Sequence, residues 1–100
     1  MTHAEQIMAA VAHITEVQGF GEFSRDDVRR RIGVEIDTWL YGYTAIFQGM
    51  RIDHPGKAPV VGERFASAFR RVCHGRYVLT PKGKQLAREF VAGRAESAPR

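Results

Sequence analysis

Hydrophobic side chains recur at helical spacing in the first part of the chain. Four of them fall on one face of a helix: Ile7, Val11, Ile14 and Val17. Thr2 followed by Glu5 has the spacing of an N-terminal capping box, and Gly19 is expected to end the helix. Residues 20–23 (Phe-Gly-Glu-Phe) then have the pattern of a short extended segment. They are expected to form a small strand.

A second helix is predicted over residues 25–32. Ser24 can cap its first N–H groups, with Asp27 as the reciprocal partner. Two apolar positions have the spacing of a hydrophobic staple: Phe23 and Val28. Gly33 is the expected C-terminal stop, since glycine readily adopts the left-handed conformation found there.

A third helix is predicted over residues 37–50, with Glu35 or Asp37 near its cap. Its buried face is expected to hold Trp39, Tyr43, Ile46, Phe47 and Met50. Its opposite face would carry Tyr41, Thr44, Ala45, Gln48 and Arg51. Residues 51–62 contain two prolines and two glycines, so a loop is expected there. Residues 63–68 are expected to form a short helix.

Residues 69–80 form the most informative stretch, because two short apolar runs flank a His74-Gly75 turn. The pattern predicts a β-hairpin whose core anchors are Phe69, Val72, Tyr77 and Leu79. Basic side chains crowd the turn: Arg70, Arg71, His74 and Arg76. Cys73, the one cysteine of the chain, is expected to fill core space.

A last helix is expected to open at Thr80-Pro81, a capping residue followed by the proline favoured in a first helical turn. Its inward residues would be Leu86, Phe90 and Val91. The length of 100 residues fits one domain, predicted to span residues 1–92, with a flexible tail at 93–100.

The order of these elements predicts an α+β, mostly α, fold. A three-helix core, a C-terminal hairpin and a final helix together make a winged helix-turn-helix. In that arrangement the helix at 37–50 would enter the major groove of DNA, and the hairpin would form the wing. An ordinary helical corner with a charged edge hairpin is the alternative interpretation of the same pattern.

Charge adds to this picture through its distribution. The net charge is +4, yet residues 1–24 carry three glutamates and no Lys or Arg, so the positive charge lies entirely beyond residue 24. This asymmetry favours one face for a polyanion, with double-stranded DNA as the expected partner. The alternative is a basic protein without a nucleic-acid role. Candidate DNA contacts are Arg25, Arg29, Tyr41, Thr44, Gln48, Arg51, Arg70, Arg71, His74, Arg76 and Lys82.

The motif Phe-Arg-Arg-Val-x-x-Gly-Arg-Tyr-x-Leu at 69–79, following Trp39, Tyr43, Phe47 and Met50, resembles a known family. It is similar to small prokaryotic winged-helix domains appended to restriction-modification proteins, and more distantly to HARE-type winged helices. The turn at 79–84 (Leu-Thr-Pro-Lys-Gly-Lys) also resembles the entry to the last helix of bacterial winged-helix regulators. The resemblance covers about residues 5–90. It implies DNA binding or partner-assisted DNA targeting without catalysis.

A second hypothesis is a protein-interaction module of a phage or mobile element that binds a host factor. Tyr41 separates the two: exposure beside Trp39 in an apolar patch favours a protein partner, whereas surrounding arginines favour DNA. An enzyme would need Asp53, His54 and Glu63 in one cleft, and no catalytic motif, phosphate loop or metal-ligand spacing supports one. We therefore expect no enzyme activity, no metal and no cofactor.

The remaining expectations concern the setting of the protein. No apolar run is long enough to span a bilayer and no leader opens the chain, so a cytoplasmic, nucleoid-associated protein without membrane contact is expected. The small core leaves a homodimer open.

Overall fold

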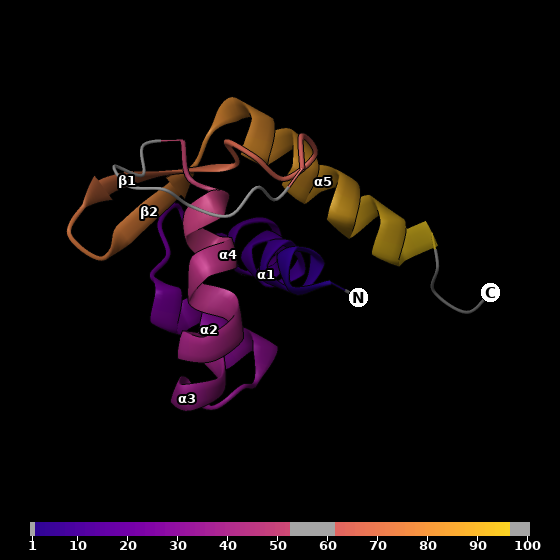
Figure 1. Ribbon diagram of the computed structural model, residues 1–100. Helices are drawn as coiled ribbons and strands as arrows, with labels where there is room; N and C mark the ends of the chain where they lie inside the picture. Colours follow the sequence, from indigo (N-terminus) through magenta and orange to yellow (C-terminus); the bar gives the residue numbers. More distant parts are fainter. Residues whose placement is uncertain (1, 53–61, 97–100) are drawn as a thin grey trace.

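The computed structural model describes residues 2–52 and 62–96. In chain order its elements are α1 (His3–Ala12), the π-helical turn η1 (His13–Val17), α2 (Arg25–Ile32), α3 (Ile36–Thr38), the π-helical turn η2 (Trp39–Tyr43), α4 (Thr44–Gly49), β1 (Phe69–Cys73), β2 (Arg76–Leu79) and α5 (Pro81–Glu96). In Figure 1, α1 lies at the centre and packs against α5, α2 and α4. The structure is thus a small α+β fold, mostly helical, as predicted.

The predicted helix ends are confirmed where local side chains set them. Thr2 accepts from the Glu5 N–H at 3.1 Å, and the Thr2 N–H donates to the Glu5 carboxylate at 3.0 Å. This second bond holds the pKa of Glu5 below its usual value. Ser24 and Asp27 make the same reciprocal pair at 3.0 and 2.9 Å. Gly33 ends α2 with a φ of +88°.

The third helix is continuous from residue 36 to 49, but a π-helical turn interrupts its regular geometry. Of the five predicted core residues, Ile46 is partly buried. The other four are buried: Trp39, Tyr43, Phe47 and Met50. The turn meets α1 at Gly42, where the His3 ring lies so close that an added Cβ would come within 2.9 Å of it. The His3 ring also stacks on Tyr43, with centroids 4.1 Å apart.

An aromatic cluster attaches the hairpin to the helices. Phe47 of α4 lies with its ring centroid 5.1 Å from that of Phe69 and 5.0 Å from that of Tyr77. The ring centroid of Phe23 lies 5.3 Å from that of Phe69. Phe23 also exchanges two backbone hydrogen bonds with Tyr77, at 3.0 and 2.9 Å. The strand expected at 20–23 is therefore reduced to one bridging residue. The rings of this cluster come from α4, from Phe23 and from both strands. Their contacts therefore fix the base of the hairpin on the core.

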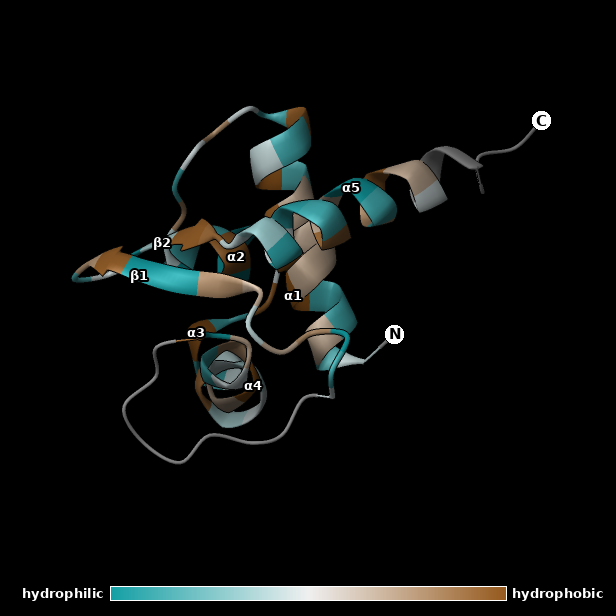
Figure 2. Ribbon diagram, turned by 90° about the horizontal axis from the view of Figure 1, so that it is seen from above, coloured by the Kyte–Doolittle hydropathy of each residue, from teal (hydrophilic) through white to brown (hydrophobic). Residues whose placement is uncertain are grey.

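The outer part of the hairpin leaves the core earlier than the sequence predicts. Phe69, Tyr77 and Leu79 are buried as expected, but Val72 is 40% exposed and Cys73 is exposed. Both predictions of burial are wrong because β1 extends past the aromatic cluster after its first residue, and an irregularity follows Arg71. Figure 2 shows the hydrophilic middle of β1 followed by its apolar tip.

Two further segments differ from expectation. Residues 63–67 form turns instead of a short helix, and Ser67 adopts a left-handed conformation with a φ of +60° that a helix does not admit. Thr80 joins this segment to α5, because its hydroxyl donates to the Ser67 carbonyl at 2.6 Å and accepts from the Gly83 N–H at 3.1 Å. The helix α5 continues to Glu96, past residue 92, and residues 97–100 lie outside the described residues.

Candidate nucleic-acid interface

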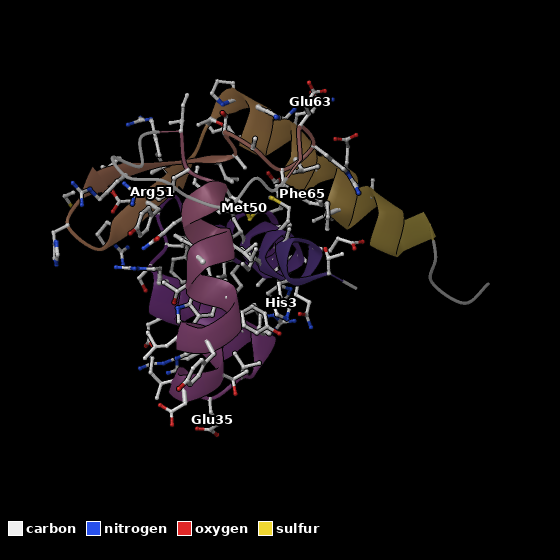
Figure 3. All side chains as sticks on the ribbon, in the orientation of Figure 1. His3, Glu35, Met50, Arg51, Glu63 and Phe65 are labelled. Carbon is white, nitrogen blue, oxygen red and sulfur yellow. The ribbon has the colours of Figure 1, made fainter. Side chains whose placement is uncertain are left out.

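Arg51 lies beside the base of the hairpin because the chain leaves α4 alongside β1. The Phe69 N–H donates to the Met50 carbonyl at 3.2 Å, and the Ile52 N–H donates to the Phe69 carbonyl at 2.8 Å. The guanidinium carbon of Arg51 lies 5.3 Å from the centroid of the Tyr77 ring, within cation–π range. Figure 3 shows Arg51 at the end of α4 that meets the hairpin.

Arg71 occupies the strand position directly opposite Tyr77. Residues opposite one another in an antiparallel pair leave the sheet on the same face. Arg71 is exposed, so its guanidinium adds to that of Arg51 on the Tyr77 side of the hairpin. Gln48 lies one helical turn before Arg51, and the exposed His74 lies in the hairpin turn. We call these four residues, Gln48, Arg51, Arg71 and His74, the basic hairpin face.

Arg70 leaves the hairpin on the opposite side. It pairs with Val78 and lines an open hollow of about 400 Å³ together with Phe20 and Lys84. Glu16 lines the same hollow, so the two cations there face a carboxylate. Positive charge therefore occurs on both faces of the hairpin. Only on the Tyr77 side does the end of α4 lie next to it.

Two other predicted contacts are engaged within the fold. Arg29 donates to the Asp26 carboxylate at 2.8 Å and to the Val34 carbonyl at 3.0 Å, so it joins the first turn of α2 to the residue beyond Gly33. The hydrogen bond from the Arg29 guanidinium holds the pKa of Asp26 below its ordinary value. Arg76 approaches Glu22 at 3.3 Å and Asp27 at 3.9 Å. These arginines mainly stabilise local structure and offer less of their charge to a polyanion.

The remaining candidates, Thr44, Lys82 and Arg25, come from three different helices, α4, α5 and α2. The Thr44 hydroxyl donates to the Trp39 carbonyl at 3.3 Å, inside the π-helical turn. Lys82, in the first turn of α5, donates to the Glu63 carbonyl. Arg25 is the first residue of α2 and is half-buried. The structure does not bring these three together.

Tyr41 lies at the other end of the third helix and is 95% exposed. Its exposed neighbours on the helix are Ile36 and Leu40, together with the acidic residues Glu35 and Asp37. Figure 3 shows Glu35 and Arg51 at opposite ends of this helix. Sequence reasoning missed Ile36 and Leu40 as exposed residues, because in a regular α-helix their spacing places them on the face of Tyr43 and Phe47, which is buried. The criterion for a protein partner is met only in part, because Tyr41 is exposed but Trp39, expected beside it at the surface, is 3% exposed and belongs to the core.

Comparisons with known proteins add no assignment: no family model, no curated protein and no solved structure matches this chain. Within residues 2–52 and 62–96, no group of three or more metal-ligating side chains occurs. Over the same ranges, none of the helices has the length and apolarity needed to cross a bilayer. Asp53 and His54, considered above for an enzyme, lie outside the described residues, and Glu63 is exposed.

Proposed function

We propose that this chain binds duplex DNA as a winged helix-turn-helix, through the basic hairpin face. The order of α1, the bridging residue Phe23, α2, the third helix and the hairpin supports a winged-helix arrangement. The observation that carries the proposal is that Arg51 lies over the Tyr77 ring while Arg71 is the strand partner of Tyr77. Two guanidinium groups on one protruding hairpin suit the closely spaced phosphates of a duplex.

The charges along the third helix limit how it can meet DNA. Glu35 and Asp37 would be repelled by phosphates, whereas the opposite end carries Gln48 and Arg51. In the proposed complex, the α4 end of the helix and the hairpin contact the duplex, and the α3 end points away. The Gln48 amide can pair with an adenine edge, while the arginines and His74 contact the backbone. Arg70 can reach a neighbouring phosphate from the other side of the hairpin.

The biological role that fits this proposal is regulation or DNA targeting. The motif at 69–79 resembles winged-helix domains of restriction-modification proteins, and that likeness supports a prokaryotic regulator or targeting module. A role in bringing a partner to DNA also agrees with a separate surface for that partner at the far end of the third helix.

A salt titration tests the proposal. Fluorescence anisotropy with a labelled random-sequence duplex would give the dissociation constant at several KCl concentrations for the native chain, Arg71→Ala and Arg88→Ala. Arg88 is exposed on α5, which runs away from the hairpin in Figure 1, so its variant changes the net charge equally. We expect Arg71→Ala to weaken binding and to reduce the salt slope by about 0.9, the value for one lost phosphate contact. Equal effects of the two variants would contradict the proposal.

A further inference from the structure

The α3 end of the third helix exposes more apolar surface than the fold requires. Ile36 is 51% exposed and Leu40 is 61% exposed, one helical turn apart, and Tyr41 adjoins Leu40. Together these side chains form an exposed apolar surface, and contiguous apolar patches on a monomer are often functional. We call Ile36, Asp37, Leu40 and Tyr41 the Tyr41 face.

A hollow beside Tyr41 adds a polar component to this face. It has a volume of about 400 Å³, and its lining includes Asp37, Thr38 and Tyr41 from the helix and His3 from α1. The His3 ring already covers one face of Tyr43, whereas the Tyr41 ring is open to solvent. A carboxylate next to an open aromatic ring is suited to a cationic side chain, which gains an ion pair and a cation–π contact there.

We propose that the Tyr41 face docks a basic amphipathic helix of another protein. Leucine-like side chains of that helix would cover Ile36 and Leu40, and a lysine or arginine would enter the hollow beside Asp37. The i, i+4 spacing of Ile36 and Leu40 suits a second helix, because rows of side chains four residues apart pack into one another. The proposal does not depend on DNA binding, since the Tyr41 face lies in residues 36–41, at the start of the third helix, and Gln48 and Arg51 lie at its other end.

Other occupants fit this surface less well. In a symmetric dimer through this patch, Glu35 and Asp37 of the two copies would approach each other, and like charges would repel. Nucleic acid and anionic membranes are disfavoured by the same two carboxylates. A basic segment of a different protein brings no like charge to these carboxylates.

A defined peptide tests the proposal on the full chain. The probe is a synthetic peptide of about 18 residues, made of Leu and Lys with Leu at i, i+3, i+4 and i+7, which is long enough to form a helix. Amide chemical-shift mapping on the ¹⁵N-labelled protein is expected to show changes confined to residues 35–43 and to the facing residues of α1. The control peptide keeps every Leu and replaces Lys by Glu, and it should not bind.

Variants separate the apolar and the charged contributions. Leu40→Ala and Asp37→Asn should each weaken binding of the Leu/Lys peptide at least about fivefold, as expected for anchor residues. Val72→Ala, which removes an exposed apolar side chain from the hairpin, should leave peptide binding unchanged. Leu40→Ala should also leave DNA binding unchanged, so failure of this proposal can be told from failure of the DNA proposal. Equal binding of the Leu/Glu peptide, or shifts beyond residues 35–43 and the facing residues of α1, would overturn it. So would a dimer of the native chain that Leu40→Ala dissociates.

Discussion

Replacing Phe47 by alanine should remove the attachment between the third helix and the hairpin. The Phe47 ring is fully buried, and its centroid lies 5.0 Å from that of Tyr77 and 5.1 Å from that of Phe69. Truncating a buried phenylalanine costs about 3–5 kcal/mol, since a cavity remains where the ring was. For a domain of this size, each kcal/mol lowers Tm by about 4–8 °C, so we expect a decrease of at least about 12 °C.

Thermal unfolding followed by far-UV circular dichroism measures this effect. Leu40→Ala is the matched control, because Leu40 lies on the same helix but is mostly exposed, and its truncation should change stability by less than about 0.5 kcal/mol. If Phe47→Ala lowered Tm no more than Leu40→Ala does, the aromatic cluster would not be what fixes the hairpin on the core.

Three further predictions follow from individual contacts. Gly83→Ala should destabilise the protein by at least about 1 kcal/mol in urea unfolding, because the new Cβ would lie only 2.0 Å from a backbone carbonyl oxygen; an unchanged midpoint would refute the close approach. Because Arg29 lowers the pKa of Asp26, the pair stabilises the fold above the ordinary carboxyl pKa of about 3.9 and this contribution is lost as pH falls through the lower folded value. Acid unfolding of Asp26→Asn should therefore be less steep than that of the native chain. Arg76→Ala should reduce the salt slope of DNA binding by less than about 0.9, the value for one lost phosphate contact, since its charge faces two carboxylates.

Elements set by nearby residues could be predicted from the sequence. Ser24 and Asp27, which cap α2, are three residues apart, and the left-handed conformation of Gly33 follows from its lack of a side chain. Both features are therefore independent of residues far away in the sequence. The buried face of the third helix followed in the same way from the spacing of Trp39, Tyr43 and Phe47. The order of helices and hairpin could be assembled from such local signals.

Features that depend on distant partners could not be predicted. Arg71 and Arg76 look alike in the sequence, and only the fold brings Glu22 beside Arg76. Val72 is apolar like the core residues around it, but it stands three positions after Phe69 on the strand and is 40% exposed. The π-helical turn coincides with the contact between Gly42 and His3, 39 residues apart. Tertiary contacts thus decide which candidate side chains face solvent.

Amide chemical-shift mapping with a random-sequence duplex, at low salt, tests the central proposal most directly. The account predicts fast-exchange shifts at residues 48–51 and 70–76, on α4 and the hairpin, with residues 35–41 unchanged. The shifts should diminish as KCl is raised, because the contacts are to phosphates. No binding at low salt, or shifts centred on the Tyr41 face, would contradict the account.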